Sequence, residues 1–203
     1  MKKKIVKITA LFLALFLVVA CSNNNEEDQT AELDVARVTI SFVYNEQEGY
    51  ASNQYAVWIE DMDNNYVTTL FATNFTAEGG YKERPNSLRD WVKKSDLADK
   101  SKEEISTFAG ATPKSGEVNY DWILTDENGN TVPDGEYRFF VEGTLRDKNQ
   151  VLYSGVIKIG NGTVTVDVEP KFHYEATERY EALSGDSIEL GMIVEVQAIY
   201  YPE

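Results

Sequence analysis

The strongest constraint on the fold is a two-residue alternation of apolar and polar side chains that recurs through most of the chain. Over 35–45, every second residue from Val38 is apolar, as expected of a strand with one buried face. Two β-branched and aromatic runs, 55–60 and 66–71, flank an Asp- and Asn-rich stretch, which predicts a hairpin. Further strands are predicted over 117–125, 136–147, 151–159, 162–169, 171–178 and 192–200. Many short strands with turn signals between them favour a β-sandwich.

One segment departs from this alternation. Leu88, Trp91 and Val92 fall on one face of a helix, and Ser87 stands where an N-cap residue is expected. We therefore predict one or two short helices over 87–108, inserted between strands, with Trp91 packed against the core.

The first 20 residues have the pattern of an export signal. Four lysines among the first seven residues precede an apolar run that ends at Ala20, and this run is shorter than the roughly 20 residues that span a bilayer. Cys21, the only cysteine, follows directly. This ending resembles the lipobox of bacterial lipoproteins, whose cysteine becomes the lipidated N-terminus. We predict cleavage after residue 20 and lipidation of Cys21; an ordinary signal peptide with a chance cysteine is the alternative.

Composition then divides the chain into three parts. Residues 1–20 are the predicted lipoprotein signal peptide, 21–33 are polar and acidic and form a flexible tether, and 34–203 are long enough for a single β-sandwich domain. The formal net charge is −15 at pH 7, which opposes nucleic-acid phosphates and excludes nucleic acid as a partner. With Cys21 lipidated, no thiol remains for a disulfide or a redox pair.

The most specific motif runs from Trp122 to Tyr137 and reads Trp-x-x-x-Asp-x-x-Gly-x-x-Val-Pro-x-Gly-x-Tyr. This pattern resembles the immunoglobulin-like module of flagellar hook-capping proteins. Taken with 55–76 and the helix at 88–91, the segment 109–144 resembles a predicted periplasmic family called domain of unknown function 2271, over roughly 35–170. The resemblance implies a mainly β fold, an immunoglobulin-like antiparallel β-sandwich with one or two short inserted helices, and it transfers no activity.

The resemblance also implies a cellular setting, because that family often accompanies membrane PepSY proteins and a periplasmic flavin transferase. Residues 106–112 are similar to the Asp-x-x-Ser/Thr-Gly-Ala-Thr signature at which this transferase esterifies FMN onto the final threonine, here Thr112. Ser106 and Ala109 depart from the signature at its acidic and hydroxyl positions. A Gly-Ala turn that leads from a helix into a strand is therefore the favoured interpretation, and flavinylation of Thr112 is the alternative.

Residues that carry chemistry are few. The only histidine, His173, lies in a predicted strand without a nucleophile or a second histidine near it in sequence, which favours a solvated strand face. The acidic stretch 61–65 begins like a calcium loop, but Tyr66 and Ala72 occupy the positions that need glycine and a bidentate glutamate. We therefore predict no catalytic residue and no metal site.

The longest surface loop is predicted over 77–86, and loops on a rigid sandwich often form binding sites. A binding loop there would include Gly79, Gly80, Tyr81, Arg84 and Trp91; the alternative is an ordinary loop that enters a helix.

Together these features predict a non-enzymatic, lipid-anchored, extracytoplasmic lipoprotein of the cell envelope, periplasmic or surface-facing. It would act as a binding or accessory module, contact the membrane through its lipid, and bind another envelope protein without a cofactor. The alternative is an accessory of an extracytoplasmic flavin-linked electron-transfer or iron-handling system, with FMN as the cofactor.

Overall fold

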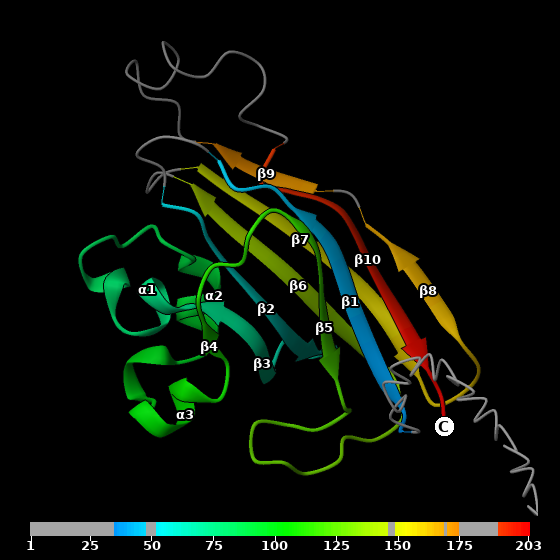
Figure 1. Cartoon of the computed structure of the whole chain (residues 1–203). Coiled ribbons are helices and arrows are strands. Elements are labelled where there is room, and N and C mark those ends of the chain that lie inside the picture. The colour runs from blue at the N-terminus through cyan, green and yellow to red at the C-terminus, as the bar shows by residue number, and fades with distance from the viewer. Residues whose placement is uncertain (1–34, 48–51, 146–148, 169, 175–190) are drawn as a thin grey trace, which may run out of the picture. The chain divides into compact units, whose positions relative to one another are not determined.

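The computed structural model describes residues 35–47, 52–145, 149–168, 170–174 and 191–203, and it confirms a mainly β chain folded as a β-sandwich (Figure 1). Contacts group the chain into two units, Met1–Leu33 and Asp34–Glu203, and all described residues belong to the second. Within the described ranges, no helix has the length and apolar character needed to cross a membrane.

Two sheets form the sandwich. Sheet A has the strand order β5-β1-β10-β8 and is antiparallel throughout. Its strands are β1 (Arg37–Tyr44), β5 (Gly116–Trp122), β8 (Val164–Asp167) and β10 (Ile193–Tyr201). Sheet B has the order β4-β3-β2-β6-β7-β9, and only its β3–β4 pair is parallel. Its strands are β2 (Gln54–Asp61), β3 (Tyr66–Thr73), β4 (Ala109–Gly110), β6 (Gly135–Leu145), β7 (Asn149–Ile159) and β9 (Pro170–Tyr174).

Nine of the ten described strands lie where the alternation predicts them, with ends shifted by a few residues, and the short strand β4 was not predicted. Residues 175–178 of the strand predicted over 171–178 lie outside the described residues. Pro170 begins β9, which pairs only with β7 at the edge of sheet B, as suits a residue that has no N–H to donate. The predicted turn between β7 and β8 is also present, and Gly162 in it has φ +62°.

The main core fills the space between the two sheets. The inward residues of β1, among them Phe42 and Tyr44, are buried, and they face buried residues of β2. Tyr55 of β2 lies near the centre, with its ring centroid 5.5 Å from that of Phe42, 5.4 Å from Tyr44 and 5.0 Å from Phe71. Such tilted and edge-on aromatic contacts add to the burial of apolar area.

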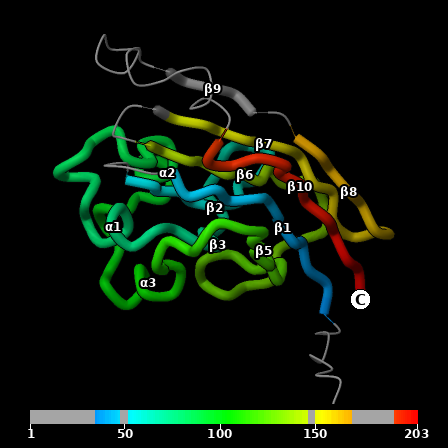
Figure 2. Tube along the Cα trace, turned by 45° about the horizontal axis from the view of Figure 1, so that its top comes forward, coloured from blue at the N-terminus to red at the C-terminus, as the bar shows by residue number. Residues whose placement is uncertain are grey.

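A second core lies on the other face of sheet B, so β2 is buried on both faces. Ala56 and Trp58 of β2 pack there with Leu88, Trp91 and Phe108 from the segment after β3. Figures 1 and 2 show the helices of this segment gathered on one side of the molecule, beside β2, β3 and β4. The prediction that Trp91 packs against the core is confirmed, since its side chain is fully buried.

The helical insertion is longer and more divided than predicted. It contains α1 (Asn74–Ala77), the 3₁₀ turn η1 (Gly80–Lys82), α2 (Arg89–Lys94), the 3₁₀ turn η2 (Leu97–Asp99) and α3 (Lys102–Ser106). The two elements before residue 87 were missed because helices of three or four residues are too short to show a period of 3.6 residues. In α3, Ser101 and Glu104 form a capping box.

The predicted N-cap of α2 is wrong. The helix begins at Arg89 after Leu88, which adopts a left-handed backbone with φ +48°, and no side chain of the adjoining residues caps it. The Ser87 hydroxyl instead forms a 2.7 Å hydrogen bond with Thr76 Oγ1 in the α1 region. A carboxylate from a strand distant in sequence takes the place of the local cap.

Trp122 offers a test of the main core. Its side chain is 1% exposed, its indole Nε1–H donates to the Thr125 carbonyl at 2.8 Å, and its ring meets Tyr137 edge-on. Trp122→Ala should lower the free energy of unfolding by about 3–5 kcal/mol, measured by chemical denaturation. The neighbouring Ile123 is 56% exposed, so Ile123→Ala should cost less than about 0.5 kcal/mol. Equal losses in the two variants would contradict this account of the core.

Candidate functional site

A large cleft lies between α2 and the outer face of sheet B. It encloses about 1060 Å³ and is lined by residues of β2, β6 and β7, by α2, and by residues of the loops beside them. We call it the α2 cleft. Its position follows from the fold, because α2 covers only part of the sheet and leaves β7 residues at the other side of the opening.

The floor of the α2 cleft is aromatic. Trp58 on β2 and Phe140 on β6 are direct partners in the sheet, and their rings stack with centroids 4.7 Å apart and planes 6° from parallel. Ser154 on β7 is paired with Phe140 in turn and also lines the cleft, as does Leu152. The strand register thus places the side chains of Trp58, Phe140 and Ser154 in a row beneath the opening.

A buried carboxylate of the sheet holds the C-terminal end of α2. Glu60 is 3% exposed and lies on the outer face of β2. Its carboxylate accepts a hydrogen bond from Trp58 Nε1 at 2.8 Å and forms an ion pair with Lys94 Nζ at 3.1 Å. The same contacts fix the Trp58 indole and the last residue of α2, so this end of the cleft wall is held in place.

A second buried carboxylate, Glu142 of β6, holds the start of α2. It accepts hydrogen bonds from the backbone N–H groups of Trp91 at 2.8 Å and Asp90 at 3.4 Å. Gln150 donates from its side chain both to Glu142 and to Asp90 Oδ2. Burial raises the pKa of the Glu142 carboxyl to about 7, and the hydrogen bond from Trp91 opposes that rise. Glu142 therefore replaces the missing local cap of this helix.

Four basic side chains line the α2 cleft. Lys94 Nζ and Arg138 Nη1 both donate to Asn64, to its backbone carbonyl and its side-chain oxygen respectively. Lys100 forms an ion pair with Glu127 and lies over the Tyr66 ring, 5.1 Å from its centroid. The fourth is Lys93, on α2. Four carboxylates line the cleft as well, so its lining has no net formal charge, whereas the whole chain has a formal charge of −15.

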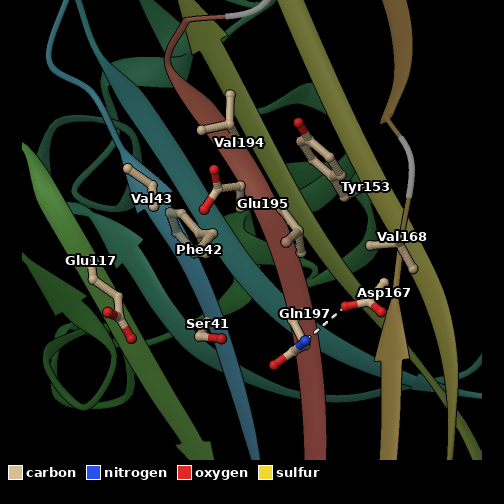
Figure 3. A pocket seen from close by; sticks show the side chains of 11 residues that line it. Ser41, Phe42, Val43, Glu117, Tyr153, Asp167, Val168, Val194, Glu195 and Gln197 are labelled. Carbon is tan, nitrogen blue, oxygen red and sulfur yellow. Dashed lines mark hydrogen bonds between the residues drawn. The ribbon is translucent and has the colours of Figure 1, made fainter.

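A smaller groove of about 640 Å³ lies on sheet A, where β8 leaves β10 (Figure 3). Glu117, Asp167 and Glu195 line it from three strands, and Asp167 accepts a 2.7 Å hydrogen bond from Gln197. The register between β1 and β10 shifts here, and Glu195 has a left-handed backbone with φ +57°, which marks a β-bulge. In the part of the chain that the structure describes, no group of three or more metal-ligating side chains is placed to hold an ion.

The predicted binding loop lies apart from both depressions. Gly79 has φ +111°, and a Cβ on Gly80 would collide with the Phe75 carbonyl, so the fold of the loop accounts for both glycines. Arg84 lies over the Phe75 ring at 4.7 Å, and Tyr81 is half-buried. Trp91, the fifth predicted member, is buried beneath α2, where its Nε1–H donates to Thr69 at 2.8 Å. The structure therefore separates Trp91 from the exposed part of this loop.

Thr112 is exposed between β4 and β5, and its hydroxyl donates a long 3.4 Å hydrogen bond to the Asn53 carbonyl. His173 lies in β9 opposite Gln150, and its side chain is outside the described part of the structure, as is Cys21. The stretch 61–65 forms the predicted hairpin turn, in which Asp61 accepts hydrogen bonds from the backbone N–H groups of Asp63 and Asn65.

Sequence reasoning missed the residues that line the α2 cleft. Trp58 and Phe140 are far apart in the chain, and only the pairing of β2 with β6 brings them together. One signal was available: 55–59 is apolar at consecutive positions and does not alternate. A strand of this kind is buried on both faces, which implies a second covering layer and an edge to that layer.

Comparison with known proteins gives one match. A family model described as predicted periplasmic protein (DUF2271) matches residues 36–191, which confirms the resemblance inferred from the motifs and extends it beyond residue 170. No curated protein and no solved structure was found that matches the chain.

The Glu142 carboxyl should make stability depend on pH. Its pKa is raised from 4.5 to about 7 in the folded state, so the folded protein binds the proton more tightly than the unfolded chain does. Its contribution is therefore largest below pH 4.5 and is lost as the pH rises through about 7, by on the order of 3 kcal/mol. Glu142→Gln should remove this fall between those pH values, as measured by urea unfolding at several pH values.

The matched control is Glu136→Gln, on the same strand but exposed. It should leave the pH dependence as it is in the parent protein. A Glu142→Gln variant whose stability changes with pH like that of the parent would show that Glu142 is not the titrating group.

Proposed function

We propose that this chain, which belongs to the DUF2271 family of predicted periplasmic proteins, is a membrane-tethered extracytoplasmic lipoprotein that acts as a non-catalytic binding module. The observation that carries the proposal is the α2 cleft. It combines an aromatic floor with polar groups held in fixed positions, the combination typical of small-molecule sites.

The extent of the family match supports the α2 cleft over the groove on sheet A. All residues that line the cleft fall between Trp58 and Ser154, inside the matched range 36–191. The groove takes Val194, Glu195, Val196 and Gln197 from β10, which lies beyond that range. A ligand site that is shared by the family is therefore expected in the cleft rather than in the groove on sheet A.

The arrangement of the acidic side chains supports recognition rather than catalysis. Glu60 is held by Trp58 and Lys94, and Glu127 is held by Lys100. These two of the four cleft carboxylates thus stabilise neighbouring side chains, whereas a general acid or base has to reach the reacting group. We include an envelope protein among the proposed partners, since a lipid anchor and an acidic tether would keep the sandwich close to other membrane-bound proteins.

The tether is tested at Cys21. In cells that express the full chain, the protein should be recovered with the membrane fraction and should incorporate labelled palmitate. Cys21→Ala should lose the label and move to the soluble fraction, while the neighbouring Ser22→Ala should behave like the parent. A Cys21→Ala variant that stays with the membranes would contradict lipid anchoring at this residue.

Thr112 supports a second candidate function, an accessory of an extracytoplasmic flavin-linked electron-transfer or iron-handling system. Its hydroxyl is exposed on a loop, where a transferase can reach it, and it stands at the acceptor position of the flavinylation-like segment. In this proposal FMN is bound covalently through a phosphoester with Thr112 Oγ1.

Intact mass after co-expression with the flavin transferase tests this second function. Flavinylation would add the mass of one FMN less one water, and Thr112→Ala would abolish the gain. Thr107→Ala, at an exposed hydroxyl on the preceding helix cap, is the matched control and should keep it. An unchanged mass in the parent protein would exclude Thr112 as an acceptor of FMN.

A further inference from the structure

An apolar strip on sheet B continues outward from the α2 cleft. Phe140 and Leu152 line the cleft and are only partly buried, and Val156 on the same face of β7 is 40% exposed. Val156 is paired with Arg138 in the sheet, so the strip ends beside a guanidinium group. An exposed apolar strip that adjoins a cleft is typical of a surface that binds an apolar ligand or ligand part.

Two cations at this cleft have no carboxylate partner. Lys94 and Lys100 form ion pairs with Glu60 and Glu127. No acidic side chain of the described residues lies within ion-pair distance of Lys93 or Arg138. The Arg138 guanidinium has five N–H donors, and its hydrogen bond to Asn64 uses one of them. Two cations remain available for an anionic group.

Three of the four carboxylates in the cleft form ion pairs with neighbouring cations. Asp90 accepts a hydrogen bond from Gln150 and lies 4.0 Å from the Arg89 guanidinium. Asp96 is exposed and is the one cleft carboxylate that forms no ion pair with a described residue. Asp96 should therefore lower the affinity for an anion, and Asp96→Asn should raise it.

We propose that the α2 cleft binds a small amphipathic anion. Arg138 and Lys93 hold its carboxylate or phosphate head, and its apolar body lies over Phe140 and Leu152. This proposal rests on the proposed function, in which the same cleft is the ligand site. It names the chemical class of ligand that the cleft recognises.

Two fluorescent probes with the same aromatic skeleton test the charge preference. The anionic probe is 8-anilinonaphthalene-1-sulfonate, and the neutral one is N-phenyl-1-naphthylamine. Both are titrated into the full chain. Arg138→Gln and Lys93→Gln should each lower the affinity for the anionic probe about tenfold and change the affinity for the neutral probe by less than about twofold. Lys114→Gln, at an exposed lysine outside the cleft, is the control and should change neither affinity.

Competition then separates the two head groups. Decanoate and decyl phosphate are added to the complex with the anionic probe, with decanol as the neutral reference, and the stronger competitor identifies the head. Asp96→Asn should improve the binding of both anions. Thermal unfolding of every variant shows whether a loss of binding reflects a loss of fold.

The outcomes distinguish the two proposals. If the neutral probe binds and the anionic probe is unaffected by Arg138→Gln and Lys93→Gln, the ligand is apolar and the anion proposal is overturned, while the cleft remains the binding site. If neither probe binds, or if Phe140→Ala leaves the binding of both unchanged in a folded variant, the cleft is not the site, and the proposed function fails with it.

Discussion

The burial of β2 on both faces is the constraint on which the rest of this structure depends. Tyr55 faces the core between the sheets, whereas Trp58 faces away from it, and neither side chain is exposed by more than 2%. A two-layer sandwich buries only one face of each sheet, so the outer face of sheet B needs a further cover. The segment between β3 and β4 provides it. The fold is therefore a sandwich with a partial third layer, and the α2 cleft lies at the edge of that layer.

The third layer is held by its contacts with the sheet, because its helices are too short to be stable alone. Its α-helices have four to six residues, well below the roughly 12 that an isolated helix needs. Glu142 and Glu60, from neighbouring strands of sheet B, bind the start and the end of α2. A buried carboxylate is costly unless hydrogen bonds and counter-charges surround it, so each position is restricted to a residue that can make these contacts. The same two residues thus fix the helix and the shape of the cleft.

The strands could be predicted closely from the sequence, and the helical cover could not. Alternation over 35–45 and the turn residues around 61–65 are local signals, and the elements they predict are present. The cap of α2 was assigned to Ser87, the nearest suitable residue, but the actual acceptor is Glu142, more than 50 residues further along the chain. The α2 cleft was missed for the same reason, because the stacking of Trp58 with Phe140 depends on strand register. Local patterns do not carry information about contacts between distant residues.

The two outer faces of the sandwich differ in charge, and this difference bears on where a ligand is recognised. On sheet A the outward side chains include Glu117, Asp121 and Glu195, which are exposed and keep that face solvated. On sheet B, α2 brings lysines over an aromatic floor in a chain that is otherwise strongly acidic. A surface of one sign repels like-charged ligands and raises the local concentration of opposite ones. The acidic face thus disfavours an anion, and the covered face, where cations balance the carboxylates, is the better place to hold one.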